Sequence, residues 1–360
     1  MTNRRTFVGQ VAAGLLAAAL IVPTAAAAEP AATVVVDGLD NPRGIDIGAN
    51  GTIVVAETGG GRVLRVRTNG TTSTVMSGLP SLVTEEGATG VHNVSLTGNG
   101  NLFILTGEAE AGTTDPFWTL FRKPITGGKA RVVAEIDAYQ ATDPDPTDVD
   151  QPPFPTQSNP YGLESVGGAR LVTDAGNNDL LLVGPKGGVQ TVARFPIEIV
   201  ATDHLPFDIG AAFIPAEAVP TTVAIGPDGA WYVGELKGFP FRPGSSNIWR
   251  IEPWARGATC DDDTSDGCSR WATGFTAITG MEFAPDGTLW VASMVKGGLF
   301  GFFSGGDSVG ALWHVDGATR TEVAEGELHL LGDVAVSKRG AVYVTTGSVT
   351  TDGAVVRIHP

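Results

Sequence analysis

Basic side chains are scarce in this sequence, and so are charged residues in general, which make up 17% of its 360 residues. Lys and Arg number 23 against 39 Asp and Glu, so the formal net charge is −16. An excess of acid disfavours binding to nucleic acids and to anionic membrane surfaces, because both require clustered cations. We therefore expect no nucleic acid partner. An acidic surface instead suits solubility, a bound cation or a cationic ligand.

Motifs for nucleophilic and nucleotide chemistry are also missing. The chain has no Gly-x-Ser-x-Gly nucleophile elbow, no phosphate-binding loop and no dinucleotide fingerprint. Neither of its two cysteines lies in a catalytic context. The residues therefore assign no reaction, and whether the protein is an enzyme stays open.

Long apolar runs are absent except near the N-terminus, where Val8–Val22 follows Arg4 and Arg5 and precedes a stretch of small residues. This order is typical of a cleavable signal peptide, and the arginine pair resembles a twin-arginine export signal. An uncleaved anchor is the alternative. We predict that residues 1–28 are a signal peptide and that 29–360 form one secreted or cell-envelope domain. No membrane span then remains after cleavage.

The two cysteines, Cys260 and Cys268, bracket the polar loop CDDDTSDGC. In an exported protein, cysteines eight positions apart across such a loop predict a disulfide that staples the loop. The loop also resembles the start of a calcium-binding loop at Asp262 and Thr264. However, Thr273 stands where a closing Glu is required.

Glycine is abundant, with 49 residues, and its spacing reveals a repeat. An apolar strand, a Gly-containing turn and a second apolar strand recur six times, most clearly in Val219–Phe241. The six turn glycines are Gly51, Gly100, Gly168, Gly229, Gly287 and Gly340. Low charge together with this repeat predicts many short strands rather than helices.

The two ends of the repeat are complementary. A third and a fourth strand follow most hairpins, but the last unit stops at Ala354–His359 without a fourth strand. Thr33–Asp37, before the first unit, is left over. In a propeller an N-terminal strand can complete the last blade and so remove the free edge. We predict an all-β, six-bladed β-propeller closed by its N-terminal strand, and a monomer. A β-sandwich or solenoid is the alternative.

The repeat also predicts a common face for the ends of the second strands. The sixth residue after each turn glycine is polar, and in three blades it is a carboxylate: Glu57, Asp174 and Glu235. Because strand directions repeat, these positions share the face where loops converge and ligands commonly bind. Together with neighbouring polar residues they define our predicted ligand-binding face, which consists of Glu57, His92, Asn93, Asp174, Asn177, Glu235 and Lys237. The simpler alternative is that polar residues end strands at water.

Two kinds of chemistry fit this predicted face. Oxygen ligands from Glu57, Asp174 and Glu235 suit one divalent cation, calcium or a similar ion, on the propeller axis. Alternatively, a carboxylate and His92 could act as general acid and base. The partner is expected to be a small molecule or a protein whose identity the residues do not specify.

Three runs resemble the ScyD/ScyE family of exported β-propellers, named after members of the scytonemin pigment cluster: Asn159–Leu163, Val172–Leu182 and Val219–Phe241. The opening segment GLDNPRGIDIGANGTIVVAETGGGRVLRV also fits that family. The resemblance implies an exported six-bladed propeller that binds a ligand or partner, without an established reaction.

The fold is further similar to NHL-repeat and gluconolactonase-like propellers. The latter imply a divalent metal on the axis, held by Glu, Asn and Asp, with Glu57 in the place of their first-blade glutamate. A metal-dependent hydrolase or lactonase is therefore the alternative function. A redox propeller with a quinone cofactor is a third option, which would need a basic pocket.

Overall fold

A computed structural model describes residues 31–84, 87–109, 113, 115–150, 152–261 and 265–359. The predicted signal peptide lies outside these residues, as do Asp262 and Thr264 of the predicted calcium loop. Within the described ranges, no helix has the length and apolarity needed to cross a bilayer.

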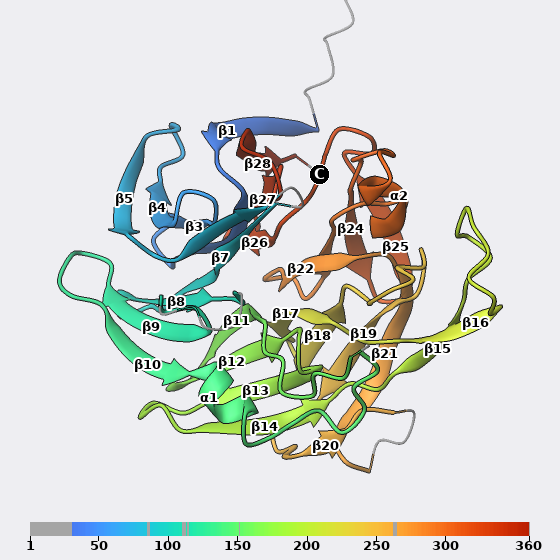
Figure 1. Cartoon of the computed structure of the whole chain (residues 1–360). Helices are drawn as coiled ribbons and strands as arrows, with labels where there is room; N and C mark the ends of the chain where they lie inside the picture. Colours follow the sequence, from blue (N-terminus) through green and yellow to red (C-terminus); the bar gives the residue numbers. More distant parts are fainter. Residues whose placement is uncertain are drawn as a thin grey trace, which may run out of the picture. The chain divides into compact units, whose positions relative to one another are not determined.

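Six antiparallel sheets are arranged as the blades of a ring (Figure 1). Blade 1 comprises β2 (Pro42–Ile47), β3 (Ile53–Glu57), β4 (Arg62–Val66) and β5 (Thr72–Ser77). Blade 2 comprises β7 (Gly87–Leu96), β8 (Asn101–Thr106), β9 (Thr119–Pro124) and β10 (Arg131–Glu135). Blade 3 comprises β11 (Pro160–Val166), β12 (Ala169–Asp174), β13 (Asp179–Val183) and β14 (Val189–Arg194). Blade 4 comprises β17 (Pro220–Ile225), β18 (Trp231–Glu235), β19 (Ser246–Ile251) and β21 (Cys268–Phe275). Blade 5 comprises β22 (Ile278–Phe283), β23 (Leu289–Ser293), β24 (Ala311–Asp316) and β25 (Thr319–Val323).

The sixth blade joins the two ends of the chain, as predicted. It contains β26 (Val334–Val336), β27 (Val342–Thr346) and β28 (Gly353–Ile358), and β1 (Ala32–Leu39) is its outermost strand. β1 pairs antiparallel with β28, with Ala32 opposite Ile358. This pairing leaves no gap in the ring between the first and last repeats, so the prediction of a six-bladed propeller is confirmed.

In five of the six blades the predicted turn glycine has a positive φ angle, as the hairpin turn requires. Gly51, for example, has φ +79° and Gly287 has φ +90°, a region that residues with a Cβ rarely adopt. Blade 3 differs because Val166 pairs directly with Ala169, which leaves a turn of two glycines. There the positive φ of +54° falls on Gly167 rather than on Gly168.

Apolar side chains pack between neighbouring blades. One cluster joins Leu171 and Leu180 of blade 3 to Val233 and Trp249 of blade 4. Both faces of a blade are thereby covered, which explains why the strands are apolar almost throughout. In β3 every residue is buried. Burial on both faces stabilises the ring through the removal of apolar surface from water.

Several short elements lie outside the repeat and were not predicted. They are β6 (Ser81–Thr84), β15 (Glu198–Ala201), β16 (Phe213–Ala216), β20 (Ala258–Thr259), α1 (Ile136–Gln140) and α2 (Leu299–Phe303). The hairpin of β15 and β16 projects outward from the ring (Figure 1). The predicted disulfide is confirmed, with 4.8 Å between the Cα atoms of Cys260 and Cys268.

Candidate functional site

The inner strands of blades 1 to 4 run along the propeller axis and contribute residues to two separate cavities. Arg43, His92 and Tyr161, near the starts of their strands, line a cavity that we call the axial mouth. Asp46 and Glu164, further along the same strands, line a second cavity that we call the axial channel. The predicted ligand-binding face corresponds to the mouth end.

Two of the predicted carboxylates, Glu57 and Asp174, are fully buried and bonded within their own blades. Glu57 accepts hydrogen bonds from the Asp40 amide (2.9 Å) and from Nη2 of Arg62 (3.0 Å), with which it forms a salt bridge. Asp174 accepts from Ser158 Oγ and the Asn159 amide, both at 2.6 Å. These bonds hold the loops that follow or precede the strands.

The third predicted carboxylate, Glu235, is also fully buried. It accepts hydrogen bonds from Asn247 Nδ2 (2.9 Å) and Trp249 Nε1, and its Oε2 lies 2.8 Å from Lys237 Nζ. Burial raises the pKa of Glu235, while Lys237 opposes that shift. Each of the three carboxylates is thus satisfied inside a separate blade, and the structure does not bring them together.

The remaining predicted residues divide between the interior and the mouth. Lys237 is 1% exposed and also pairs with Glu198 at 2.7 Å. Asn177 donates to the carbonyl oxygens of Pro155 and Gln157. Asn93 lines the axial channel, where its Oδ1 accepts from the Val94 amide. Of the seven residues, His92 alone lines the axial mouth.

Both ring nitrogens of His92 are occupied. Nδ1 lies 3.0 Å from the Pro160 carbonyl oxygen, and Nε2 lies 3.0 Å from Arg43 Nη1. Because a carbonyl only accepts and an arginine only donates, the bonds assign the neutral tautomer with its proton on Nδ1. Burial, aided by Arg43, holds the pKa of His92 well below its ordinary 6.5. In this arrangement His92 has no free lone pair with which to act as a general base.

Arg43 is the central polar group of the axial mouth. Its Nη2 donates to the Ala88 carbonyl at 2.6 Å, and its guanidinium lies 5.4 Å from the centre of the Tyr161 ring. Its Nε is buried without a hydrogen-bond partner among the described residues. The Oδ1 of Asn159, in the same cavity wall, is likewise buried and unpartnered there.

The rest of the axial mouth combines one carboxyl group with an apolar wall. Asn159 Nδ2 donates to Glu108 at 3.0 Å, and burial raises the pKa of Glu108. The apolar side of the cavity, about 390 Å³ in volume, is formed by Leu236, Met294, Leu299, Phe303 and Val349. A cavity of this size and character suits a small molecule with a polar head and an apolar body.

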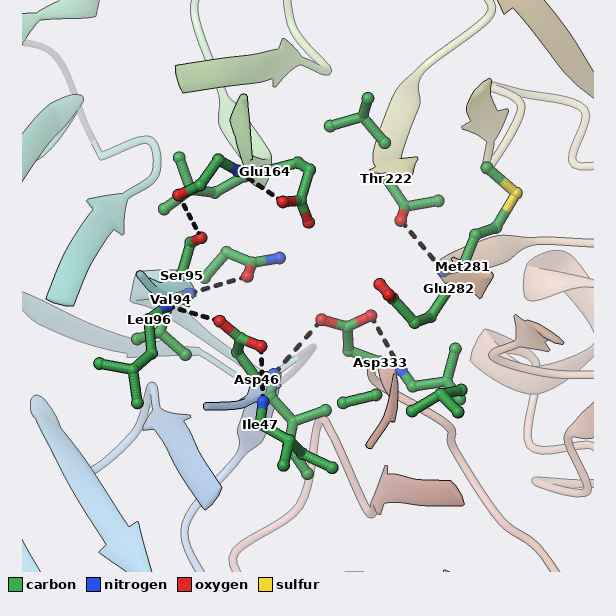
Figure 2. A pocket seen from close by; sticks show the side chains of 18 of the residues that line it. Asp46, Ile47, Val94, Ser95, Leu96, Glu164, Thr222, Met281, Glu282 and Asp333 are labelled. Atoms are coloured by element: carbon green, nitrogen blue, oxygen red, sulfur yellow. Dashed lines mark hydrogen bonds between the residues drawn. The ribbon is translucent and has the colours of Figure 1, made fainter. Parts of the chain in front are cut away.

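Four acidic side chains converge in the axial channel (Figure 2): Asp46, Glu164, Glu282 and Asp333. Burial raises the pKa of Asp46 to about 6 and the pKa values of Glu164 and Asp333 to about 8. It raises that of Glu282 well above its ordinary value, and the three other carboxyls add to the shift. Burial, reinforced by repulsion between the carboxyl groups, therefore favours the protonated forms.

Sequence reasoning missed the axial channel, although the repeat contained the signal. The fifth residue before the turn glycine is Asp46 in blade 1 and Glu282 in blade 5, each between two apolar residues. A charge inside an apolar inner strand is the anomaly that distinguishes them. The predicted face was defined instead by the ends of the second strands, where Glu57, Asp174 and Glu235 are hydrogen-bonded inside the protein.

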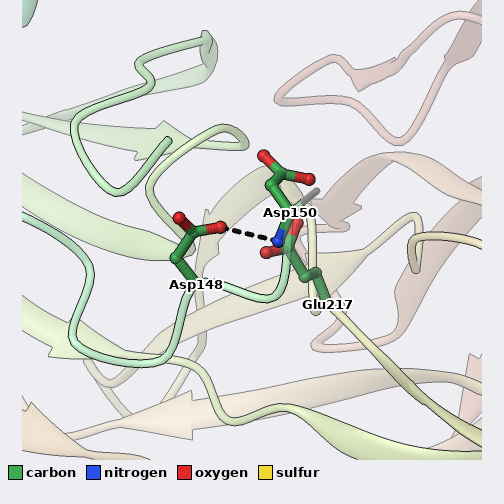
Figure 3. Close-up of side chains that lie close together, drawn as sticks. All are labelled: Asp148, Asp150 and Glu217. Carbon is green, nitrogen blue, oxygen red and sulfur yellow. Dashed lines mark hydrogen bonds between the residues drawn. The ribbon is translucent and has the colours of Figure 1, made fainter. Parts of the chain in front are cut away.

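A separate acidic group lies in the loop that joins α1 to β11, between blades 2 and 3, where Asp148 and Asp150 approach Glu217 (Figure 3). Within the described ranges, this is the one set of three His, Cys, Asp or Glu residues whose ligand atoms all lie within 4.8 Å of one another. Asp148 accepts from the amides of Asp150 and Phe154. Burial and the neighbouring carboxylates raise the pKa values of Asp150 and Glu217.

Comparison with known structures supports the class of protein that the fold defines, a six-bladed β-propeller. A soluble aldose sugar dehydrogenase from Escherichia coli is 15% identical, with a TM-score of 0.57 over 91% of this chain and 99% of that one. A glucose dehydrogenase-type oxidoreductase from Thermus thermophilus is 20% identical, with a TM-score of 0.55 over 91% and 99%. A structure described as a gluconolactonase is 12% identical, with a TM-score of 0.54 over 92% and 93%.

The TM-scores establish the shared fold, and identities of 20% or less establish nothing about the reaction. No protein-family model matches the chain, and a comparison with curated protein sequences finds no match either. The resemblance to the ScyD/ScyE family therefore stays a prediction.

Proposed function

We propose that this protein is an exported propeller that binds a small molecule in the axial mouth, with Arg43 at the polar end of the site. The observation that carries the proposal is the pair of unpartnered buried atoms, Arg43 Nε and Asn159 Oδ1. A buried polar atom without a partner costs about 1–3 kcal/mol. A ligand head group that accepts from one and donates to the other would remove that cost.

The geometry of the mouth favours binding because Arg43 is held in place before any ligand arrives. His92, the Ala88 carbonyl and the Tyr161 ring restrain its guanidinium from three sides. Restraint of this kind lowers the entropy lost on binding. The proposed site therefore lies at Arg43, beside His92, and not at the predicted carboxylates, each of which is hydrogen-bonded within the protein.

The test uses two probes with an aromatic body: benzamide, whose amide can both accept from Arg43 Nε and donate to Asn159 Oδ1, and benzoate, whose carboxylate can only accept. We expect calorimetry to detect binding, and Arg43→Met to weaken it by about tenfold, the usual scale for one charge-assisted hydrogen bond. Arg67→Met, an exposed arginine in a turn of blade 1, is the control. Equal affinity in the wild type and Arg43→Met, or no affinity for either probe, would contradict the proposal.

A metal-dependent hydrolase or lactonase is the second candidate, and the cluster of Asp148, Asp150 and Glu217 favours it. Carboxylate oxygens at this spacing suit a calcium ion or a similar divalent cation. The predicted axial ligands do not offer such a set. Metal analysis after addition of calcium, manganese or zinc tests this candidate, together with a lactone hydrolysis assay. Absence of both bound metal and activity would exclude it.

Export and a monomeric state are the remaining parts of the proposal; the paired arginines and the apolar run before Ala28 support export. The mass of the secreted protein would identify cleavage after Ala28, and its sedimentation would give the oligomeric state. A mature chain that retains the apolar run Val8–Val22 would contradict cleavage.

A further inference from the structure

Four cationic side chains gather between blades 2 and 3 of this otherwise acidic protein. Arg122 and Arg131 come from β9 and β10, Arg170 comes from β12, and Lys186 comes from the turn between β13 and β14. They line a cavity of about 360 Å³ that we call the basic groove. The residues that line it include no Asp or Glu.

Arg122 and Arg131 stand directly opposite each other in neighbouring strands. Like charges in this position destabilise an antiparallel pair. The ion pairs of the described residues include none of the four cations. Arg122 Nε donates to Asn101 Oδ1 at 3.0 Å, which leaves its positive charge uncompensated.

Arg170 supplies an independent indication of a ligand. It is 5% exposed, its Nη1 donates to the Ala169 carbonyl, and its Nε is buried without a partner. Its guanidinium lies 3.4 Å from the centre of the Phe103 ring, and Phe103 is the cross-strand partner of Arg122. Burial lowers the pKa of Arg170 to about 10; Glu164 in the axial channel opposes that shift, and Arg122 adds to it.

The position of Lys186 is restrained by close packing between the blades. A Cβ atom at Gly187 would lie 2.1 Å from the Val133 carbonyl oxygen in β10, so only glycine fits there. This contact holds the turn that carries Lys186 against blade 2. The backbone on either side of the basic groove is therefore closely packed at this point.

We infer that the basic groove binds a tetrahedral oxyanion, a phosphate or sulfate group. Arginine forks match the oxygens of such groups, and an anion between Arg122 and Arg131 would turn their repulsion into two attractive contacts. The buried Nε of Arg170 offers a further donor. Phe103 and Val132 supply apolar walls for whatever organic part the anion carries. This inference is independent of the axial mouth and of the function proposed there.

The experiment measures binding of inorganic phosphate, sulfate and phenyl phosphate by calorimetry at constant ionic strength, with sodium chloride as the salt control. We expect Arg122→Gln/Arg131→Gln to weaken oxyanion binding by about tenfold or more. Both side chains are exposed, so the variant should fold. Lys129→Gln/Arg67→Gln changes the charge equally at exposed positions outside the groove and should bind as the wild type does.

Thermal melting provides a second readout, which does not require the natural ligand to be identified. In chloride buffer the Arg122→Gln/Arg131→Gln variant should melt at a higher temperature than the wild type, and added phosphate should narrow that difference. Tighter binding of phenyl phosphate than of phosphate would identify an organic ester as the source of the anion, whereas equal binding would identify the free ion. The inference fails if the wild type binds no oxyanion or the variant binds as tightly as the wild type.

Discussion

Polar residues at the ends of the second strands show how one position in a repeat acquires its role from its neighbours. Glu57, Asp174 and Glu235 occupy equivalent positions; the first two accept hydrogen bonds from the segments that precede their blades, and Glu235 accepts from the neighbouring strand β19. Several hydrogen-bond donors around a buried carboxylate offset part of the cost of removing it from water. Equivalence in the repeat therefore reflects a shared structural requirement rather than a shared ligand.

Glu235→Gln tests this structural role. The change removes one of the two acids that face Lys237, which is 1% exposed. Because the lysine charge would be left less compensated in the interior, we expect the free energy of unfolding to fall by about 2–4 kcal/mol. Guanidinium chloride unfolding measures this change, and Glu327→Gln, at an exposed position outside the ion pairs of the described residues, is the control. Unchanged stability would contradict the structural assignment.

At the scale of the element, the strand that decides closure is β1. It shields the edge of β28, and without it the last blade would present unpaired amide and carbonyl groups. The partners lie 326 positions apart in the chain, as Ala32 opposite Ile358 illustrates. Such a contact forms only when the whole ring has assembled.

Removal of β1 should therefore weaken the entire ring rather than one blade. We expect a chain that begins at Asp40 to melt at a lower temperature and to aggregate through the exposed edge of β28. A chain that begins at Ala31 is the matched control. Differential scanning calorimetry with light scattering would show both effects, and identical melting of the two chains would contradict closure by β1.

The disulfide is the second stabilising link at this scale. Cys260 and Cys268 close a loop of about eight residues, for which chain entropy gives about 2–3 kcal/mol. Both side chains are buried, so alanine is the better replacement than serine. We expect Cys260→Ala/Cys268→Ala to lose about that much stability in urea unfolding. Reduction of the disulfide in the wild type should cause the same loss of stability. A smaller loss on reduction would mean that part of the loss in the alanine variant comes from the packing of the cysteine side chains.

At the scale of the whole molecule, the axial channel gathers acids from separate blades. Asp46, Glu164, Glu282 and Asp333 belong to four different repeats, and closure of the ring brings them together. Their raised pKa values mean that the folded protein holds protons that the unfolded chain would release. The stability of the fold should therefore depend on pH.

We expect these four groups to stabilise the fold less as pH rises. The unfolded carboxyls ionise near their ordinary values of 3.8 and 4.5, whereas Glu164 and Asp333 stay protonated in the folded state until about pH 8. Stability from this source therefore falls between about pH 4 and pH 8. Urea unfolding across that range measures it, and Glu164→Gln should flatten the decline.

The comparison with Glu164→Gln is needed because His92 changes the pH dependence of stability in the direction opposite to that of the four acids. Its lowered pKa means that stability is lost as pH falls below about 6.5. The difference between wild type and variant isolates the channel, where Arg170 and Lys338 are the nearby cations. A difference that does not change with pH would contradict the expectation.

The fold was predictable because it depends on a local pattern repeated six times. Gly51 and Gly287 mark hairpins that any blade requires, and the missing last strand together with Thr33–Asp37 predicted the closure by β1. The candidate site was predictable only in part. His92 is the one predicted residue that lines the axial mouth, whereas Arg43 and Asn159 are distinguished by the buried atoms that folding leaves without partners among the described residues.

The sequence by itself determined the number of blades, the closing strand and the disulfide, because turn chemistry, apolar alternation and cysteine spacing act over a few residues. Tertiary structure alone decided which polar groups are satisfied and which face a cavity. Whether Glu235 meets Lys237 or water, and whether Arg122 and Arg170 meet an acid, depends on contacts between loops and blades. Electrostatic energies depend on the distance between charges and on their burial, and a local sequence pattern predicts neither.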